Sequence, residues 1–185
     1  MSAPTVASVT TDKTIPAALR AAATTEWALA RNTMSGLDHL EGETLNVLAD
    51  GAVHPRRTVS SGAITLDAPA VIVHAGLPIT ADAQTLPAIL QTDSAFGQGR
   101  VKNINKAWLR VYRSSGIWIG PDAEHLVEAK QRTTEPYGSP PALKSDEVEV
   151  LLSPSWQESG QVYVRQSDPL PLTLVALTLE VQTGG

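Results

Sequence analysis

Hydrophobic and polar residues alternate in several short stretches of this chain, and the first complete example lies in residues 44–50. Leu45, Val47 and Ala49 alternate there with mostly polar neighbours, which is the period-two signature of a β-strand. The dipeptide Asp50-Gly51 follows and favours the positive φ angles of a tight hairpin turn. We therefore predict a β-module that opens at about residue 34 with a strand and a hairpin turn.

The same alternation predicts further short strands, and breaker residues predict the segments between them. Ala68-Pro69 is expected to interrupt the chain, and residues 79–99 are expected to form a long loop. Residues 123–129 offer at most a helical turn. The predicted strands cover residues 63–66, 70–74, 100–113, 117–119, 148–152, 160–165 and 172–181.

The longest alternating stretch, residues 100–113, has two different faces. One face becomes apolar toward its end and is expected to pack inward; it contains Val101, Asn103, Asn105, Ala107, Leu109, Val111 and Arg113. The other face is basic and aromatic, with Arg100, Lys102, Ile104, Lys106, Trp108, Arg110 and Tyr112. After a turn at residues 114–116, residues 117–119 are expected to pair with this strand as a hairpin.

The last predicted strand, residues 172–181, is hydrophobic over nearly its whole length. This pattern predicts a central strand that is covered on both sides. Thr173, Val175, Leu177, Leu179 and Val181 form the more apolar face, which we expect to point into the core. The pattern as a whole predicts an all-β fold, either a sandwich or a partly open barrel with long loops, over residues 34–185.

Residues 1–33 differ from the rest, because they are rich in alanine, serine and threonine and lack strand alternation. Residues 17–30 favour a helix, but their large apolar residues are too few to bury one firmly within a subunit. Two interpretations remain open for this N-terminal arm. It is either a partly ordered tail or an arm that becomes ordered on a neighbouring subunit, with Trp27 as its anchor.

Composition narrows the functional classes. The net charge is −5, which disfavours tight, sequence-independent binding to nucleic acid. There are no cysteines, so disulfides and cysteine-based zinc sites are excluded. No apolar run reaches the roughly 18 residues that span a bilayer, and we expect no secretory signal.

Candidate chemistry is sparse. Asp38, His39, Glu41 and Glu43 are conceivable metal ligands, although carboxylates and histidines in turns more often cap backbone groups, and we expect no metal or other cofactor. His39, His54, His74 and His125 show no catalytic spacing, and Ser60, Ser114 and Ser115 lack a nucleophile-elbow sequence. Asp146-Glu147 and Glu149 are typical of a solvated strand edge. We expect no enzymatic activity, and a depolymerase remains the least favoured class.

The basic and aromatic face of residues 100–113 is the main candidate site. Three interpretations are open: an interface with an acidic neighbouring subunit, a nucleic-acid surface with stacking rings beside phosphate partners, or a solvated outer face. The first is the leading one. The residues predicted to form this interface are Trp27, Lys106, Trp108, Arg110 and Tyr112.

Several stretches together resemble a known family, and their collinear order covers roughly residues 34–185. They are GLDHLEGETLNVLADGAVHP, GAITLDAPAVIVHAGLP, GQGRVKNINKAWLRVYRSSGIWIGPDAEHL, KQRTTEPYGSPPAL and VYVRQSDPLPLTLVALTLEV. In this order they resemble the C-terminal β-rich part of tail proteins of tailed bacteriophages, in particular the nozzle protein (tail tubular protein B) of short-tailed phages.

The resemblance implies a structural protein of the virion, assembled in the cytoplasm of the bacterial host. It implies a ring of identical copies, with six as a candidate number, in the tail, nozzle or head–tail connector. Neighbouring tail or connector proteins are the implied partners, genome DNA is implied only as passing cargo, and no membrane insertion is expected. The alternative is a decoration or host-attachment module on the virion surface.

Overall fold

The computed structural model describes residues 30–92, 95–96, 99–130, 139–153 and 155–184. These residues are almost entirely β, with several antiparallel sheets and neither an α-helix nor a closed barrel among them, so the predicted all-β class is confirmed. The chain divides into two compact units, residues 1–77 and 78–185, where the sequence pattern suggested one module from residue 34. Residues 1–29, and with them Trp27, lie outside the described part of the chain.

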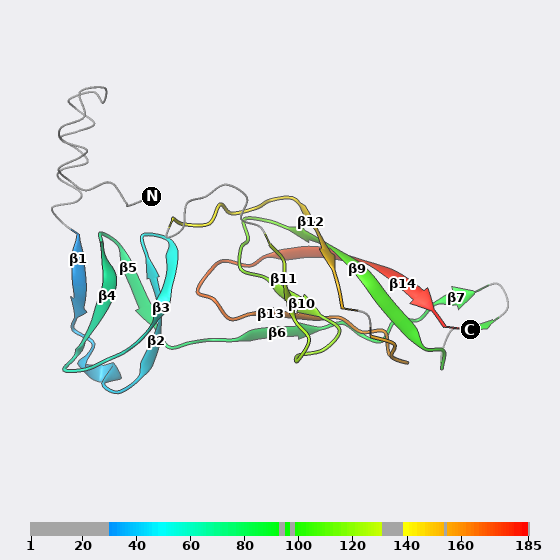
Figure 1. Cartoon of the computed structure of the whole chain (residues 1–185), viewed down its shortest axis with the longest axis horizontal. Helices are drawn as coiled ribbons and strands as arrows, with labels where there is room; N and C mark the ends of the chain where they lie inside the picture. Colours follow the sequence, from blue (N-terminus) through cyan, green and yellow to red (C-terminus); the bar gives the residue numbers. More distant parts are fainter. Residues whose placement is uncertain (1–29, 93–94, 97–98, 131–138, 154, 185) are drawn as a thin grey trace, which may run out of the picture. The chain divides into compact units, whose positions relative to one another are not determined.

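The first unit contains two small sheets (Figure 1). One pairs β1 with β4, and the other has the order β3-β2-β5. Its core cluster consists of Leu37, Leu45, Val47, Val59, Ile64, Leu66 and Ala70. The elements are β1 (Arg31–Ser35), the 3-10 helix η1 (Asp38–Leu40), β2 (Thr44–Ala49), β3 (Ala52–Thr58), β4 (Ala63–Ala70) and β5 (Val73–Gly76).

The predicted hairpin of the first unit is confirmed, whereas the predicted break is wrong. Asp50 and Gly51 have φ angles of 48° and 81° and join β2 to β3. Strand β4 runs through Ala68-Pro69 without ending. The register with β1 shifts from Thr65 to Ala70, so the proline lies where the ladder is irregular and needs no hydrogen bond from its nitrogen.

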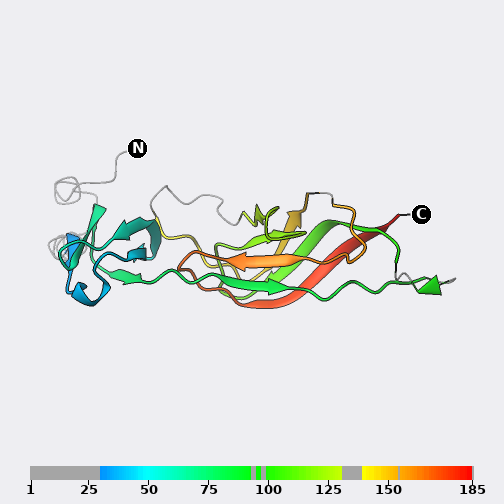
Figure 2. The same ribbon diagram turned by 90° about the horizontal axis from the view of Figure 1, so that it is seen from below.

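The second unit is a sandwich of two sheets that share one hydrophobic core (Figure 2). Sheet I has the order β12-β9-β14, and sheet II has the order β11-β10-β13-β6. Two short strands, β7 and β8, pair with each other. The elements are β6 (Ala81–Gln84), β7 (Gln91–Thr92), β8 (Ala95–Phe96), β9 (Lys102–Val111), β10 (Trp118–Gly120), β11 (Val127–Glu128), β12 (Glu147–Leu151), β13 (Tyr163–Gln166) and β14 (Leu174–Thr183).

Three predictions about this unit are corrected by strand pairing. Residues 79–99 are not one long loop, because they contain β6, β7 and β8. Strand β10 exists as predicted, but it pairs with β11 and β13 instead of β9, since the turn at residues 114–116 carries the chain to the other sheet. Residues 123–129 contain β11 and no helical turn.

Strand β14 is an edge strand among the described residues, so its predicted central position is wrong. The central strand of sheet I is β9, which pairs with β12 on one side and β14 on the other. Leu177, Leu179 and Val181 do pack against the core as expected, although only partly buried. Val175, in contrast, is 61% exposed, because the ladder shifts between Leu174 and Ala176.

Candidate functional site

Four of the five predicted interface residues lie on the solvent side of sheet I. Ala107, Leu109 and Val111 of β9 are buried in the core, and alternation therefore turns the residues between them outward. We call this solvent side the outer face of sheet I. It consists of Lys106, Trp108, Arg110 and Tyr112 from β9 and its end, Glu147, Glu149 and Leu151 from β12, and Ala176, Thr178 and Glu180 from β14.

The face is less basic than β9 alone predicts. Lys102 is only 2% exposed, and its Nζ donates to the carbonyl oxygens of Glu158 (2.8 Å) and Arg100 (3.2 Å). Ile104 is buried as well. The predicted basic face is therefore wrong at its beginning, because residues 155–158 return to β9 there and pair with Lys102 through Gln157.

The acidic neighbours of Lys106 come from the same chain. The Nζ of Lys106 lies 3.2 Å from a carboxylate oxygen of Glu149 and 6.0 Å from the ring centre of Trp108. Glu180 of β14 is the register partner of Lys106 on the other side. Lys106 thus has carboxylate neighbours within its own sheet. It does not need the acidic neighbouring subunit that the sequence predicted as its partner.

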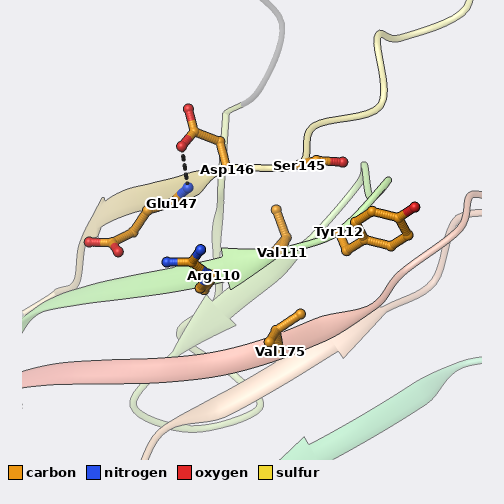
Figure 3. A pocket seen from close by; sticks show the side chains of 7 residues that line it. All are labelled: Arg110, Val111, Tyr112, Ser145, Asp146, Glu147 and Val175. Atoms are coloured by element: carbon orange, nitrogen blue, oxygen red, sulfur yellow. Dashed lines mark hydrogen bonds between the residues drawn. The ribbon is translucent and has the colours of Figure 1, made fainter.

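A hollow of about 290 Å³ lies at the end of the face where Arg110 and Tyr112 are (Figure 3). The backbone amide of Glu147 donates to the Asp146 carboxylate (2.8 Å), and the Ser145 hydroxyl accepts from the amide of Arg113 (3.0 Å). The residues that line the hollow are Arg110, Val111, Tyr112, Ser145, Asp146, Glu147 and Val175. It presents one guanidinium, two carboxylates and a phenol ring to solvent, which suits a polar contact with another chain.

The solvent side of sheet II carries a compact ion pair. Arg165 binds Asp82 through two hydrogen bonds of 2.8 and 3.0 Å and lies 5.4 Å from the ring centre of Tyr163. The hydrogen bonds from Arg165 hold the pKa of the Asp82 carboxyl below its usual value. Because these groups satisfy one another across β6 and β13, they fasten the edge strand β6 to the sheet.

The predicted metal-ligand candidates serve a turn in the first unit. The Glu41 carboxylate accepts hydrogen bonds from the amides of Ser61 (2.9 Å) and Gly62 (2.8 Å), which is a capping role. Asp38 and His39 belong to η1. Within the described ranges, no group of three or more histidines and acidic residues is placed to hold a metal ion.

Two of the four histidines, His54 and His125, also have local partners. His54 accepts a hydrogen bond from the amide of Asp67 at Nε2 (2.9 Å), and its Nδ1 lies 2.7 Å from the Pro55 carbonyl oxygen. His125 lies 2.7 Å from the Asp122 carboxylate, in a loop of the second unit. The His54 contacts join β3 to β4, the His125 contact lies within one loop, and none of these contacts involves a serine.

The described residues contain no helix that is long and apolar enough to cross a membrane. A scan against models of known protein families gives no match, and a search of curated proteins gives none either.

Proposed function

We propose that this chain is a structural component of a tailed-phage virion, assembled in the host cytoplasm from identical copies into a ring of the tail, nozzle or head–tail connector. The resemblance of residues 34–185 supplies the phage setting. The observation that supports a role in assembly is the outer face of sheet I, where Trp108 is only partly buried and charged groups of both signs surround it.

An aromatic side chain in this position suits a protein interface. Tryptophan is enriched among the residues that dominate binding energy, especially where less important polar contacts surround it and exclude water. On this face, Lys106 and Glu149 pair beside the Trp108 ring, and Arg110 and Tyr112 border the adjacent hollow. The arrangement favours a neighbouring subunit over the genome, which we propose only as passing cargo of a chain with a net charge of −5.

Replacing Trp108 by alanine is the direct test of this interface. We expect a folded protein whose association is weakened by about 2–4 kcal/mol, because a central aromatic anchor is lost. Native mass measurement would give the assembly and circular dichroism the fold. Leu86→Ala is the control, since Leu86 is 86% exposed in the second unit and lies outside sheet I and its hollow, so its truncation should leave assembly unchanged. A folded Trp108→Ala protein that assembles like the parent would remove the face from the interface.

Lys106→Glu is a less selective test than the sequence suggested. The new carboxylate would lie beside Glu149 and opposite Glu180 of the same sheet, so the change would add repulsion within the subunit. The double change Lys106→Glu with Glu149→Lys retains the pair with its polarity reversed. It therefore separates an effect on assembly from an effect on folding.

A second prediction concerns the N-terminal arm. Arg31–Ser35 forms β1 and pairs with β4, so a truncation that tests the arm should keep residue 31 onward. We propose that residues 1–30, with Trp27, contribute to the contact between copies, and we expect their removal to reduce the oligomer mass while the β fold is retained. Light scattering measures the mass, and an unchanged oligomer would exclude the arm from the interface.

A further inference from the structure

The edge of sheet I at β14 offers backbone hydrogen bonds that no described residue uses. Strand β14 pairs with β9 on one side, and no strand of the described ranges pairs with its other side. The backbone amide of Tyr112, at the end of β9, donates to the carbonyl oxygen of Thr173, so the backbone groups of Tyr112 point toward β14. Every second residue of β9 points the same way, which includes Arg110 and Trp108. Their register partners Ala176 and Thr178, and likewise Glu180, therefore direct their amide and carbonyl groups toward β9. The amide and carbonyl groups of Leu177 and Leu179 consequently point outward along the open edge.

Two irregularities limit the part of this edge that is straight enough to pair. The register with β9 shifts between Leu174 and Ala176 and again between Glu180 and Val181. Between these shifts, residues 176–180 pair regularly with β9, from Arg110 to Lys106. Since bulges bend and twist a strand, the regular run is the segment available to another strand, and its middle residue is Thr178.

We propose that a second copy of this chain pairs with the first through β14, antiparallel and about a two-fold axis at Thr178. This register is the one in which all five residues of the regular run face the same five residues of the second copy. Thr178 then faces Thr178, Leu177 faces Leu179, and Ala176 faces Glu180. The two copies of sheet I form one six-stranded sheet.

The charges on the outer face complement one another in this register. Glu180 of the second copy lies next to Ala176, and Ala176 is the register partner of Arg110 in β9. Because alanine is small, the long Arg110 side chain has room to extend across it to that carboxylate. The two-fold axis repeats the contact, which gives two Arg110–Glu180 pairs and places no like charges opposite each other.

The proposed pairing also buries apolar side chains at the edge of the sheet. Leu177 and Leu179 pack against the core but remain partly exposed at the rim of the sandwich. In the proposed pairing Leu177 of each copy contacts Leu179 of the other, so apolar surface that is now in contact with water becomes buried.

The opposite edge of sheet I is a poorer partner for β14. Strand β12 carries Glu147 and Glu149, and the amide of Glu147 is already bonded to the Asp146 carboxylate. Acidic side chains and an occupied amide are devices that protect an edge strand from pairing. Strand β14 has a single charged residue, Glu180 at the end of the regular run, and residues 176–179 carry no charge.

This inference goes beyond the proposed ring. A two-fold contact uses the same surface on both copies, so it joins two chains or two rings and does not itself close a ring. Five residues a side are far fewer than the roughly 20–30 residues a side of a standard interface, so the contact by itself is weak and depends on concentration. A cross-link therefore detects it better than a mass measurement at low concentration.

Cysteine substitution tests the register directly, because the natural chain has no cysteine. Across a non-hydrogen-bonded antiparallel pair the Cα atoms lie about 4.5 Å apart, which is within the range of a disulfide. We expect the purified full chain with Thr178→Cys to form a disulfide-linked dimer under mild oxidation. Ala176→Cys is the matched control on the same strand and face, because the two copies of residue 176 would be about 13 Å apart along the strands.

A mixture provides the second measurement. Ala176→Cys combined with Glu180→Cys should give a mixed disulfide, since these residues face each other in the proposed register. Circular dichroism confirms that each variant is folded. Absence of both the Thr178 disulfide and the mixed disulfide in folded protein overturns the pairing, and so does equally fast cross-linking of Ala176→Cys alone. Neither outcome affects the ring, which the Trp108 variant tests separately.

Charge reversal tests the proposed Arg110–Glu180 contact in the Thr178→Cys background. Arg110→Glu or Glu180→Arg alone should slow cross-linking by up to roughly 25-fold at low salt, because the change removes two surface pairs and each contributes up to about fivefold. Combining both changes should restore the rate. Equal rates in all four proteins would show that these side chains do not meet across the two-fold axis and would overturn the register.

Discussion

Replacing Leu109 by alanine is expected to destabilise the second unit by about 2–5 kcal/mol, because removal of a large buried side chain loses transfer free energy and leaves a cavity. Leu109 is fully buried in β9, with Val148 of β12 and Leu177 of β14 as its register partners. A domain of ordinary stability has only about 5–15 kcal/mol in total. The change therefore removes a large fraction of what keeps the sandwich folded.

Urea unfolding followed by tryptophan fluorescence measures this effect, since Trp108, Trp118 and Trp156 all lie in the second unit. Val175→Ala is the control for stability, because Val175 belongs to the same sheet but is exposed and should change the free energy of unfolding by no more than about 0.5 kcal/mol. An equal loss in both variants would contradict the assignment of β9 as the central strand of the core.

The parts of the fold that sequence predicted correctly depend on local chemistry. The β2–β3 hairpin follows from Asp50-Gly51, because few other dipeptides tolerate positive φ at both positions. The inward side of β9 follows from the alternation that ends in Ala107, Leu109 and Val111. In both cases the residues themselves carry the information, whatever lies elsewhere in the chain.

The predictions that were wrong concern strands whose position depends on contacts between residues far apart in the sequence. Strand β6 has the sequence Ala-Asp-Ala-Gln, which has little strand propensity, and it is held by β13 about 80 residues later through the Asp82–Arg165 pair. Strand β14 is hydrophobic enough for a central strand, yet among the described strands it lies at an edge of its sheet. Hydrophobicity alone does not distinguish a strand covered by its own chain from one that offers an edge to another.

The candidate site was predicted in part for the same reason. Alternation placed Lys106, Trp108, Arg110 and Tyr112 on one side, and the structure brings them together. Alternation did not place Glu149 beside Lys106, because that contact depends on the register of β12 against β9. Nor did it reveal that Lys102 is buried, since backbone carbonyl oxygens satisfy its ammonium group and leave no charge pattern in the sequence.

The sequence pattern does not explain why residue 120 is a glycine, and the structural reason predicts a second large effect on stability. The tripeptide Gly120-Pro121-Asp122 was predicted to end a strand, and β10 does end at Gly120. The reason for glycine is steric. A Cβ atom at this position would lie 2.1 Å from the carbonyl oxygen of His125 and 2.8 Å from its carbonyl carbon.

We therefore expect Gly120→Ala to destabilise the second unit by about 1–3 kcal/mol or more, as overpacking of an interior does. The atoms that clash belong to the backbone, so no side-chain rotation relieves the contact and the 121–126 loop has to move away from β10. Gly76→Ala is the matched control, because Gly76 is also in a strand but has no atom within 4 Å of a new Cβ. Thermal unfolding of both variants compares them, and a Gly120→Ala protein as stable as the control would mean that the loop does not pack on the strand as described.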